Sequence, residues 1–188
     1  MPGYLAALTI VLLFGMVLTR VLLMKRAGIE AMKFGQTDKT DFLILPFVLF
    51  YFYTVFAAAF GLPTLSTQRF FDVEVISWLG VFFCAAGLLM MLWSLLSFGE
   101  SFRVGIDTQQ PDKLVTSGVF AVSRNPIYVA FISVLLAQFL IFPNWVPLLY
   151  LIAGVWLIHR QVLREEEYLK QHYGAEYTEY CAHVRRYL

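Results

Sequence analysis

Long apolar segments dominate this chain and decide what it can fold into. Tyr4 to Met24, Phe42 to Leu62 and Val75 to Phe98 contain no Asp, Glu or Lys, and each has about the 20 residues that a helix needs to cross a bilayer. Hydrophobic residues make up 60% of the sequence and charged residues 14%, which leaves too little polar surface to cover a water-soluble globule. An all-α integral membrane protein is predicted.

Two shorter apolar runs follow, Ile127 to Phe142 and Trp145 to Ile158. Neither spans comfortably alone, so we expect them to cross as a tight helical hairpin. The prediction is one membrane domain over residues 1–188, with about five transmembrane helices. Three spans lie in residues 1–98, and a loop, the hairpin and C-terminal amphipathic helices lie in residues 99–188.

Positive charge is distributed unevenly in a five-span arrangement. Thirteen of the 14 Lys and Arg residues fall on one side, and Arg69 alone falls on the other. The positive-inside rule then places the Lys25 to Asp41 loop, the Gly99 to Asn125 loop and the C-terminus in the cytosol. A plasma or inner membrane is expected. The net charge of +1 argues against a nucleic-acid partner, and the three histidines lack the spacing of metal ligands, so no metal is expected.

The segment from Lys113 to Tyr128 contains charged and helix-capping residues that a simple connecting loop would not require. Asn125 is a favourable N-cap and Pro126 a favourable first helical residue, so a helix should begin there. The unpaired N–H groups of a helix N-terminus, together with Arg124, form a place for a carboxylate or phosphate. The alternative is a capped helix whose Arg124 reaches the lipid headgroups.

The segment from Arg160 to Gly174 reads as an amphipathic helix that Gly174 ends. Glu165 and Glu166 interrupt its apolar stripe, whereas Glu167 points outward. Carboxylates on an apolar face near a membrane are costly unless a cation or donor meets them, so the pair is a functional candidate. The alternative is an ion pair with Arg124 or Arg103 that only docks the tail. The stripe consists of Val155, Ile158, Val162, Leu169 and Tyr173.

Taken together, these motifs resemble the isoprenylcysteine carboxyl methyltransferase family, which is related to the phospholipid N-methyltransferases. The resemblance covers residues 113–186 and includes the Asn144-Trp145 hairpin. It is carried by Leu114-Val115-x-x-Gly118-x-Phe120, Arg124-Asn125-Pro126-x-Tyr128, Glu165-Glu166-x-x-Leu169 and Tyr173-Gly174-x-x-Tyr177-x-x-Tyr180.

The resemblance implies a membrane methyltransferase that binds S-adenosylmethionine from the cytosol and methylates a lipophilic small molecule, a lipid or a lipidated acceptor from the bilayer. Arg124 and Glu166 are expected to be catalytic, with Arg124 facing the cofactor's carboxylate and Glu166 or Glu165 its ammonium. The residues expected to bind the cofactor are Leu114, Val115, Gly118, Phe120, Arg124, Asn125, Tyr128, Glu165 and Glu166.

Two positions depart from the family pattern. Asn125 stands where the family has His, so it can hydrogen-bond but cannot titrate. Gln161 stands where the family often has Arg, and either Arg160 or Arg164 is a candidate substitute. Three rival functions remain open: phospholipid N-methylation, a nicotinamide-dependent membrane reductase, and a non-enzymatic membrane interaction protein. The acidic pair argues against the reductase, because a dinucleotide's phosphates favour basic surroundings.

Overall fold

A computed structural model of the 188-residue chain describes residues 1–26, 44–65, 68–98 and 114–188. These residues form α-helices and one short 3-10 helix, with no strand in the described part. The predicted loop residues Lys33, Lys39, Arg103 and Lys113 lie outside it. The elements are α1 (Pro2–Arg26), α2 (Ile44–Phe60), α3 (Glu74–Phe98), η3 (Gly118–Ala121), α4 (Pro126–Ile141), α5 (Trp145–Tyr173) and α6 (Ala175–His183).

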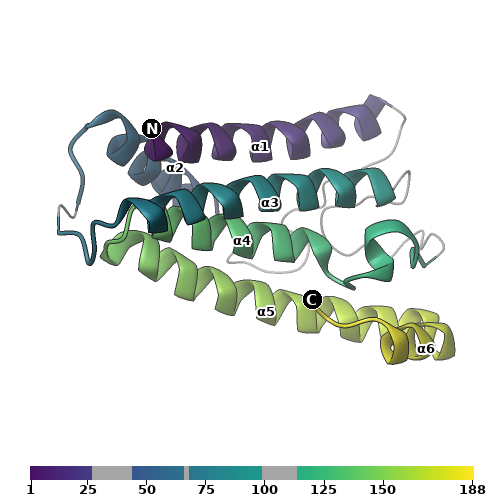
Figure 1. Ribbon diagram of the computed structural model, residues 1–188. Coiled ribbons are helices and arrows are strands. Elements are labelled where there is room, and N and C mark those ends of the chain that lie inside the picture. Colours follow the sequence, from purple (N-terminus) through teal and green to yellow (C-terminus); the bar gives the residue numbers. More distant parts are fainter. Residues whose placement is uncertain (27–43, 66–67, 99–113) are drawn as a thin grey trace.

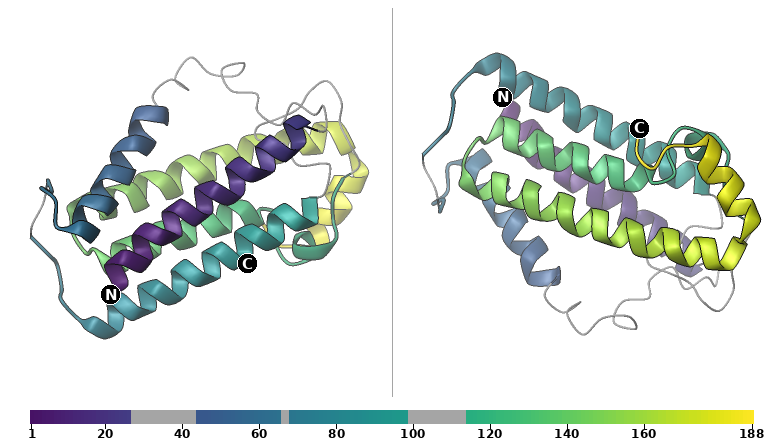
Figure 2. Two further views of the ribbon diagram at one scale, coloured as in Figure 1. Left: turned by 90° about the horizontal axis from the view of Figure 1, so that it is seen from above. Right: turned by 90° about the horizontal axis from the view of Figure 1, so that it is seen from below.

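The helices form a bundle in which α1, α3, α4 and α5 run lengthwise and α2 crosses at an angle (Figures 1 and 2). The linker from α2 to α3 meets the turn from α4 to α5, where the backbone N–H of Phe70 donates to the carbonyl of Pro143 at 2.7 Å. Helix α6 lies at the opposite end, beside η3, and the chain runs back from it toward the C-terminus near the middle of the bundle (Figure 1). Arg69 is therefore at one end of the bundle, and Arg124 and Arg186 are at the other.

Helices α3 and α4 approach closely because α3 presents glycines to α4. A Cβ on Gly80 would lie 2.7 Å from Ile141 Cγ1 and 2.9 Å from the carbonyl oxygen of Ala137. Gly87 meets Val134 in the same way, at 2.8 Å. Small residues at a helix contact allow backbones to approach, which favours packing inside a bilayer. This contact orients α4, whose first turn carries part of the candidate site.

Helix α5 differs from the prediction of a short span followed by a separate amphipathic helix. It is continuous over 29 residues from Trp145 to Tyr173. Asn144 caps it, because its side chain accepts from the backbone N–H of Val146 at 3.0 Å, and Gly174 ends it with a φ of 54°. No helix-breaking proline lies within the 26 residues that follow Pro147, so nothing ends the helix where the apolar run stops.

The outward surface confirms an all-α integral membrane protein. The described part has three helices long and apolar enough to cross a membrane, α1, α3 and α5, together with shorter apolar helices at Pro46–Phe60 and Pro126–Ile141. The count of five spans and the cytosolic C-terminus remain predictions. Large apolar side chains are exposed along these helices, as expected where lipid is the solvent; they include Leu8, Leu18, Phe82, Leu89, Leu96, Leu149, Ile152 and Trp156.

Candidate functional site

The short helix η3 forms one wall of the candidate site. Gly118 starts it with a φ of +64°, a conformation that glycine adopts without strain. The next backbone N–H, of Val119, donates to Ser97 Oγ at 3.2 Å. Phe120 is buried, and its ring meets that of Phe98 edge-on at 4.5 Å. These contacts fix η3 against the end of α3.

Helix α6 covers η3 from the other side. Tyr180 donates its hydroxyl to the carbonyl of Phe120 at 2.6 Å. Burial raises the pKa of Tyr180 to about 12, so the hydroxyl remains a donor at physiological pH. Sequence reasoning included Tyr180 in the motif but assigned it no role; the structure shows that it joins two segments 60 residues apart.

Asn125 occupies the predicted N-cap position of α4, but its side chain makes no capping hydrogen bond within the described residues. The amide Nδ2 instead donates to Glu166 Oε1 and to the carbonyl of Arg186, both at 3.1 Å. A charged carboxylate makes a stronger hydrogen bond than a neutral acceptor does, and Pro126 has no N–H to leave unpaired at the first helical position. The capping prediction is therefore wrong in its side-chain detail, although α4 does begin at Pro126.

Glu166 lies at the centre of a charged cluster. Arg124 Nη2 is 3.2 Å from Oε1, and Arg186 Nη2 is 2.9 Å from Oε2; Arg186 Nε donates to the same Oε2 at 3.0 Å. The side chains of Glu166 and Arg124 are 12% and 11% exposed, whereas that of Arg186 is 38% exposed. The predicted ion pair of Glu166 with Arg124 is present; Arg103 lies outside the described residues.

Glu165 has different partners from its neighbour. The hydroxyl of Tyr128 donates to its Oε1 at 2.5 Å, and Gln161 Nε2 donates to the same oxygen at 2.9 Å. Both donors are neutral. Gln161 thus contacts Glu165 itself at the position where an arginine was sought, while Arg160 stacks over Trp156 at 5.9 Å.

The structure brings together most of the residues predicted for the site. Arg124 and Asn125, just before α4, both contact Glu166 of α5, and Tyr128 of α4 contacts Glu165 of α5. Gly118 and Phe120 stand in η3, beside α6. Leu114 and Val115 are half-buried ahead of η3, and their contact with a cofactor remains a prediction. The predicted stripe holds at Val162, which is fully buried, and fails at Val155, which is 38% exposed.

Arg186 is the member of the cluster that sequence reasoning missed. It lies 20 residues beyond Glu166 in the chain, after α6. No periodicity links it to α5, because Gly174 ends that helix between them. The signal available was the pair Arg185-Arg186, two adjacent cations in the same C-terminal segment as two acids that break an apolar stripe.

Replacing Gly118 by alanine should destabilise the site. A Cβ there would lie 2.5 Å from Ser97 Oγ, and a left-handed conformation adds about 1–2 kcal/mol for a non-glycine residue. Gly174→Ala is the matched control, because Gly174 also has a positive φ but no atom of the described residues lies within 4 Å of where its Cβ would stand. Thermal unfolding in detergent should show the larger loss for Gly118→Ala; equal losses would contradict the close contact with Ser97.

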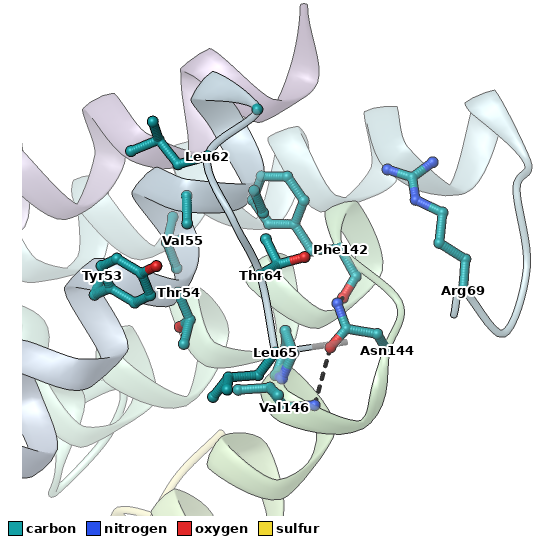
Figure 3. Close-up of a pocket in the computed structure, with 14 residues that line it drawn as sticks. Tyr53, Thr54, Val55, Leu62, Thr64, Leu65, Arg69, Phe142, Asn144 and Val146 are labelled. Carbon is teal, nitrogen blue, oxygen red and sulfur yellow. Dashed lines mark hydrogen bonds between the residues drawn. The ribbon is translucent and has the colours of Figure 1, made fainter. Parts of the chain in front are cut away.

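Two cavities open at the end of the bundle away from this cluster. The first, of about 280 Å³, lies between the end of α2 and the start of α5 and is lined by Thr54, Asn144 and Arg69 among others (Figure 3). Its polar groups already have protein partners: Thr54 donates to the carbonyl of Tyr51, and Arg69 pairs with Asp72 at 2.7 Å. The second, of about 450 Å³, shares Arg69 and Phe142 with the first. Neither contains a residue predicted for the site.

Comparison with known proteins identifies the family. Residues 75–176, more than half of the chain, match the profile of the phospholipid methyltransferase family. The chain belongs to that family. The match contains η3, Arg124, Glu165 and Glu166 and ends before Arg186. The family resemblance predicted from the sequence is confirmed, and the predicted methyltransferase class agrees with it.

Two curated relatives are isoprenylcysteine methyltransferases by name. This phospholipid methyltransferase family member is 29% identical over 112 residues to protein-S-isoprenylcysteine O-methyltransferase B of Arabidopsis thaliana. It is 28% identical over 127 residues to protein-S-isoprenylcysteine O-methyltransferase of Xenopus laevis. The alignments cover 58% and 62% of this chain but 57% and 43% of the relatives, so the chain spans about half the length of the relatives it matches. No solved structure matches it significantly.

Proposed function

We propose that this protein is an S-adenosylmethionine-dependent membrane methyltransferase that modifies a lipophilic acceptor at the bilayer surface. The observation that carries the proposal is the location of the family match. Residues 75–176 contain Arg124, Glu165 and Glu166. The fold places Arg124, just before α4, against Glu166 of α5, and Tyr128 of α4 against Glu165 of α5.

The residues of the cluster suit the charged groups of this cofactor. S-adenosylmethionine carries a carboxylate, an ammonium and a sulfonium, and the cluster offers both signs of charge. Arg124 Nε is buried and has no hydrogen-bond partner among the described residues, so it remains available to a carboxylate. Both hydrogen bonds that the structure gives to Glu165 end on Oε1, which leaves Oε2 to accept from an ammonium.

Each side chain then has a role in binding or positioning. Arg124 holds the carboxylate, Glu166 or Glu165 holds the ammonium, and Phe120 with the α6 cover limits access of water. The cofactor supplies an electrophilic methyl group, and its sulfonium becomes a neutral thioether on transfer. Positioning and a dry pocket can supply most of the rate of such an in-line displacement. Asn125 cannot accept a proton, which favours an acceptor that is already a nucleophile, such as a carboxylate.

The acceptor class follows from the relatives' names and from the membrane fold. We propose a lipidated carboxylate acceptor of the isoprenylcysteine type, because both relatives are named for that group. Phospholipid N-methylation is the second candidate, since the family profile is named for it. Incubation with methyl-labelled cofactor followed by mild base separates them, because a methyl ester releases labelled methanol whereas a methylated amine retains the label.

Calorimetric titration with S-adenosylhomocysteine tests the cofactor proposal. The detergent-solubilised protein is expected to bind it, and Arg124→Ala should weaken binding at least about tenfold by removing the partner of the carboxylate. Arg160→Ala is the control. It also removes one positive charge, but from a residue of α5 whose guanidinium lies over the ring of Trp156. Absence of binding to folded protein would leave the reductase or the interaction protein as the better explanation.

A further inference from the structure

The residues after α6 form a strap, Val184 to Leu188, which runs back from α6 toward the middle of the bundle (Figure 2). Val184 closes α6, because its backbone N–H donates to the carbonyl of Tyr180 at 3.0 Å. The rest of the strap is not helical and is held by contacts with other elements. Its Arg185 carbonyl accepts from the backbone N–H of Arg124 at 3.0 Å. Tyr187 contacts His159 Nδ1 through its hydroxyl at 2.8 Å. The strap therefore crosses the start of α4 at the charged cluster.

The strap places a guanidinium on the central carboxylate of that cluster. Arg186 contacts Glu166 Oε2 through both Nε and Nη2, while Arg124 and Asn125 contact Oε1. Within the described residues Glu166 thus has four contacts from donors, two on each oxygen, and a carboxylate has about four acceptor sites. A ligand's ammonium can reach Glu166 only if one of these donors leaves.

Arg186 is the donor that can leave most easily. Its side chain is 38% exposed, against 11% for Arg124, and ion pairs of exposed side chains contribute little to stability. Arg124 and Asn125 stand at the start of a helix packed in the core, whereas Arg186 stands on the strap. The contact between Arg186 and Glu166 also raises the pKa of the guanidinium, so Arg186 stays charged and does not release by losing a proton.

We propose that the strap is an autoinhibitory element: Arg186 occupies on Glu166 the place that the ammonium of the cofactor takes, and the strap must withdraw before the cofactor binds. This inference rests on the proposed function, since it concerns the regulation of the same site. Arg186 lies beyond the residues that match the family profile. The autoinhibitory role of the strap is therefore inferred from contacts within this chain and not from the family match.

Arg186→Gln is the direct test, with Arg185→Gln as its matched control. Both variants remove one positive charge from the strap, but of the two only Arg186 has a described side-chain contact with Glu166. A closed state that is populated about nine-tenths of the time weakens apparent affinity about tenfold. Titration of the full chain in detergent should therefore show S-adenosylhomocysteine binding about tenfold more tightly to Arg186→Gln, with Arg185→Gln within about twofold of wild type.

Hydrogen exchange provides a second measurement on the unmodified protein. Binding of S-adenosylhomocysteine should accelerate exchange of the backbone amides in the strap and of Arg124, whose N–H donates to the strap. Slower exchange in the strap on binding would show a lid that closes on the ligand and would overturn the proposal. This readout does not depend on how the variants fold.

The outcomes separate the two proposals. If wild type binds and Arg186→Gln binds equally or more weakly, the autoinhibitory contact is refuted while the methyltransferase proposal stands. If neither protein binds while both remain folded, the proposed function fails and the inference fails with it. Arg186→Lys keeps the charge but loses the forked donor, and it should bind with an affinity between those of wild type and Arg186→Gln.

Discussion

Replacing Glu166 by glutamine is expected to weaken S-adenosylhomocysteine binding about 100-fold, the largest functional effect of any single change in this chain. The substitution retains the size of the side chain but removes the charge that faces Arg124 and Arg186. A ligand's ammonium then loses its anionic partner, and the guanidinium of Arg124 beside it is left without a counter-charge. Calorimetric titration measures the loss, and labelled methyl transfer should fall with it.

The same substitution should also lower the stability of the fold. Removing one partner of a buried ion pair costs about 3–5 kcal/mol, and the exposure of Arg186 reduces this to about 2–3 kcal/mol here. Glu167→Gln is the matched control, since Glu167 is the adjacent acid and points to solvent, where it contacts Gln171. An unchanged affinity in Glu166→Gln, with Glu167→Gln also unchanged, would show that the cluster docks the tail without binding a cofactor.

Replacing Gly80 by alanine is expected to be the most destabilising single-methyl change in the bundle. The added Cβ would lie 2.9 Å from the carbonyl oxygen of Ala137 and 2.7 Å from Ile141 Cγ1. The carbonyl belongs to a helix backbone and cannot rotate away, so α3 and α4 must separate. Such overpacking costs about 1–3 kcal/mol.

Gly15 provides the matched control for this experiment. It also lies within a long apolar helix, α1, but no atom of the described residues lies within 4 Å of where its Cβ would stand. Gly15→Ala should leave stability unchanged or raise it by up to about 1 kcal/mol through better helix propensity. Thermal unfolding of both variants in the same detergent makes the comparison, and equal stability of the two would contradict the close contact between α3 and α4.

Much of the fold follows from the sequence because membrane helices are defined by local properties. The length of an apolar run predicts a helix, and Pro126 and Gly174 mark helix boundaries that the structure reproduces within one residue. The continuity of α5 could not be predicted, because the apolar run ends near Ile158 whereas the helical hydrogen bonding continues to Tyr173. The hydrophobicity of a segment indicates whether lipid or water surrounds it, whereas backbone hydrogen bonding determines where the helix ends.

Only those parts of the candidate site that leave a local pattern in the sequence could be predicted. Glu165 and Glu166 were visible because they break an apolar stripe, which is a local pattern. The side-chain partners of Asn125 and the presence of Arg186 depend on contacts across 41 and 61 residues, between Asn125 and Glu166 and between Asn125 and Arg186. No pattern within one helix contains that information. Tertiary contacts therefore decided which donors meet each acid.

The unbroken helix α5 also sets the depth of the site in the bilayer. Twenty residues separate Trp145, at its start, from Glu165, and a rise of 1.5 Å per residue makes that about 30 Å, the thickness of the hydrocarbon core. A helix that starts at one membrane surface therefore places Glu165 and Glu166 near the other surface. Deleting one residue from the apolar half would draw the acids about 1.5 Å toward the lipid and rotate them about 100° away from α4. The length of α5 between Trp145 and Glu165 therefore determines how far the candidate site lies from the start of the helix.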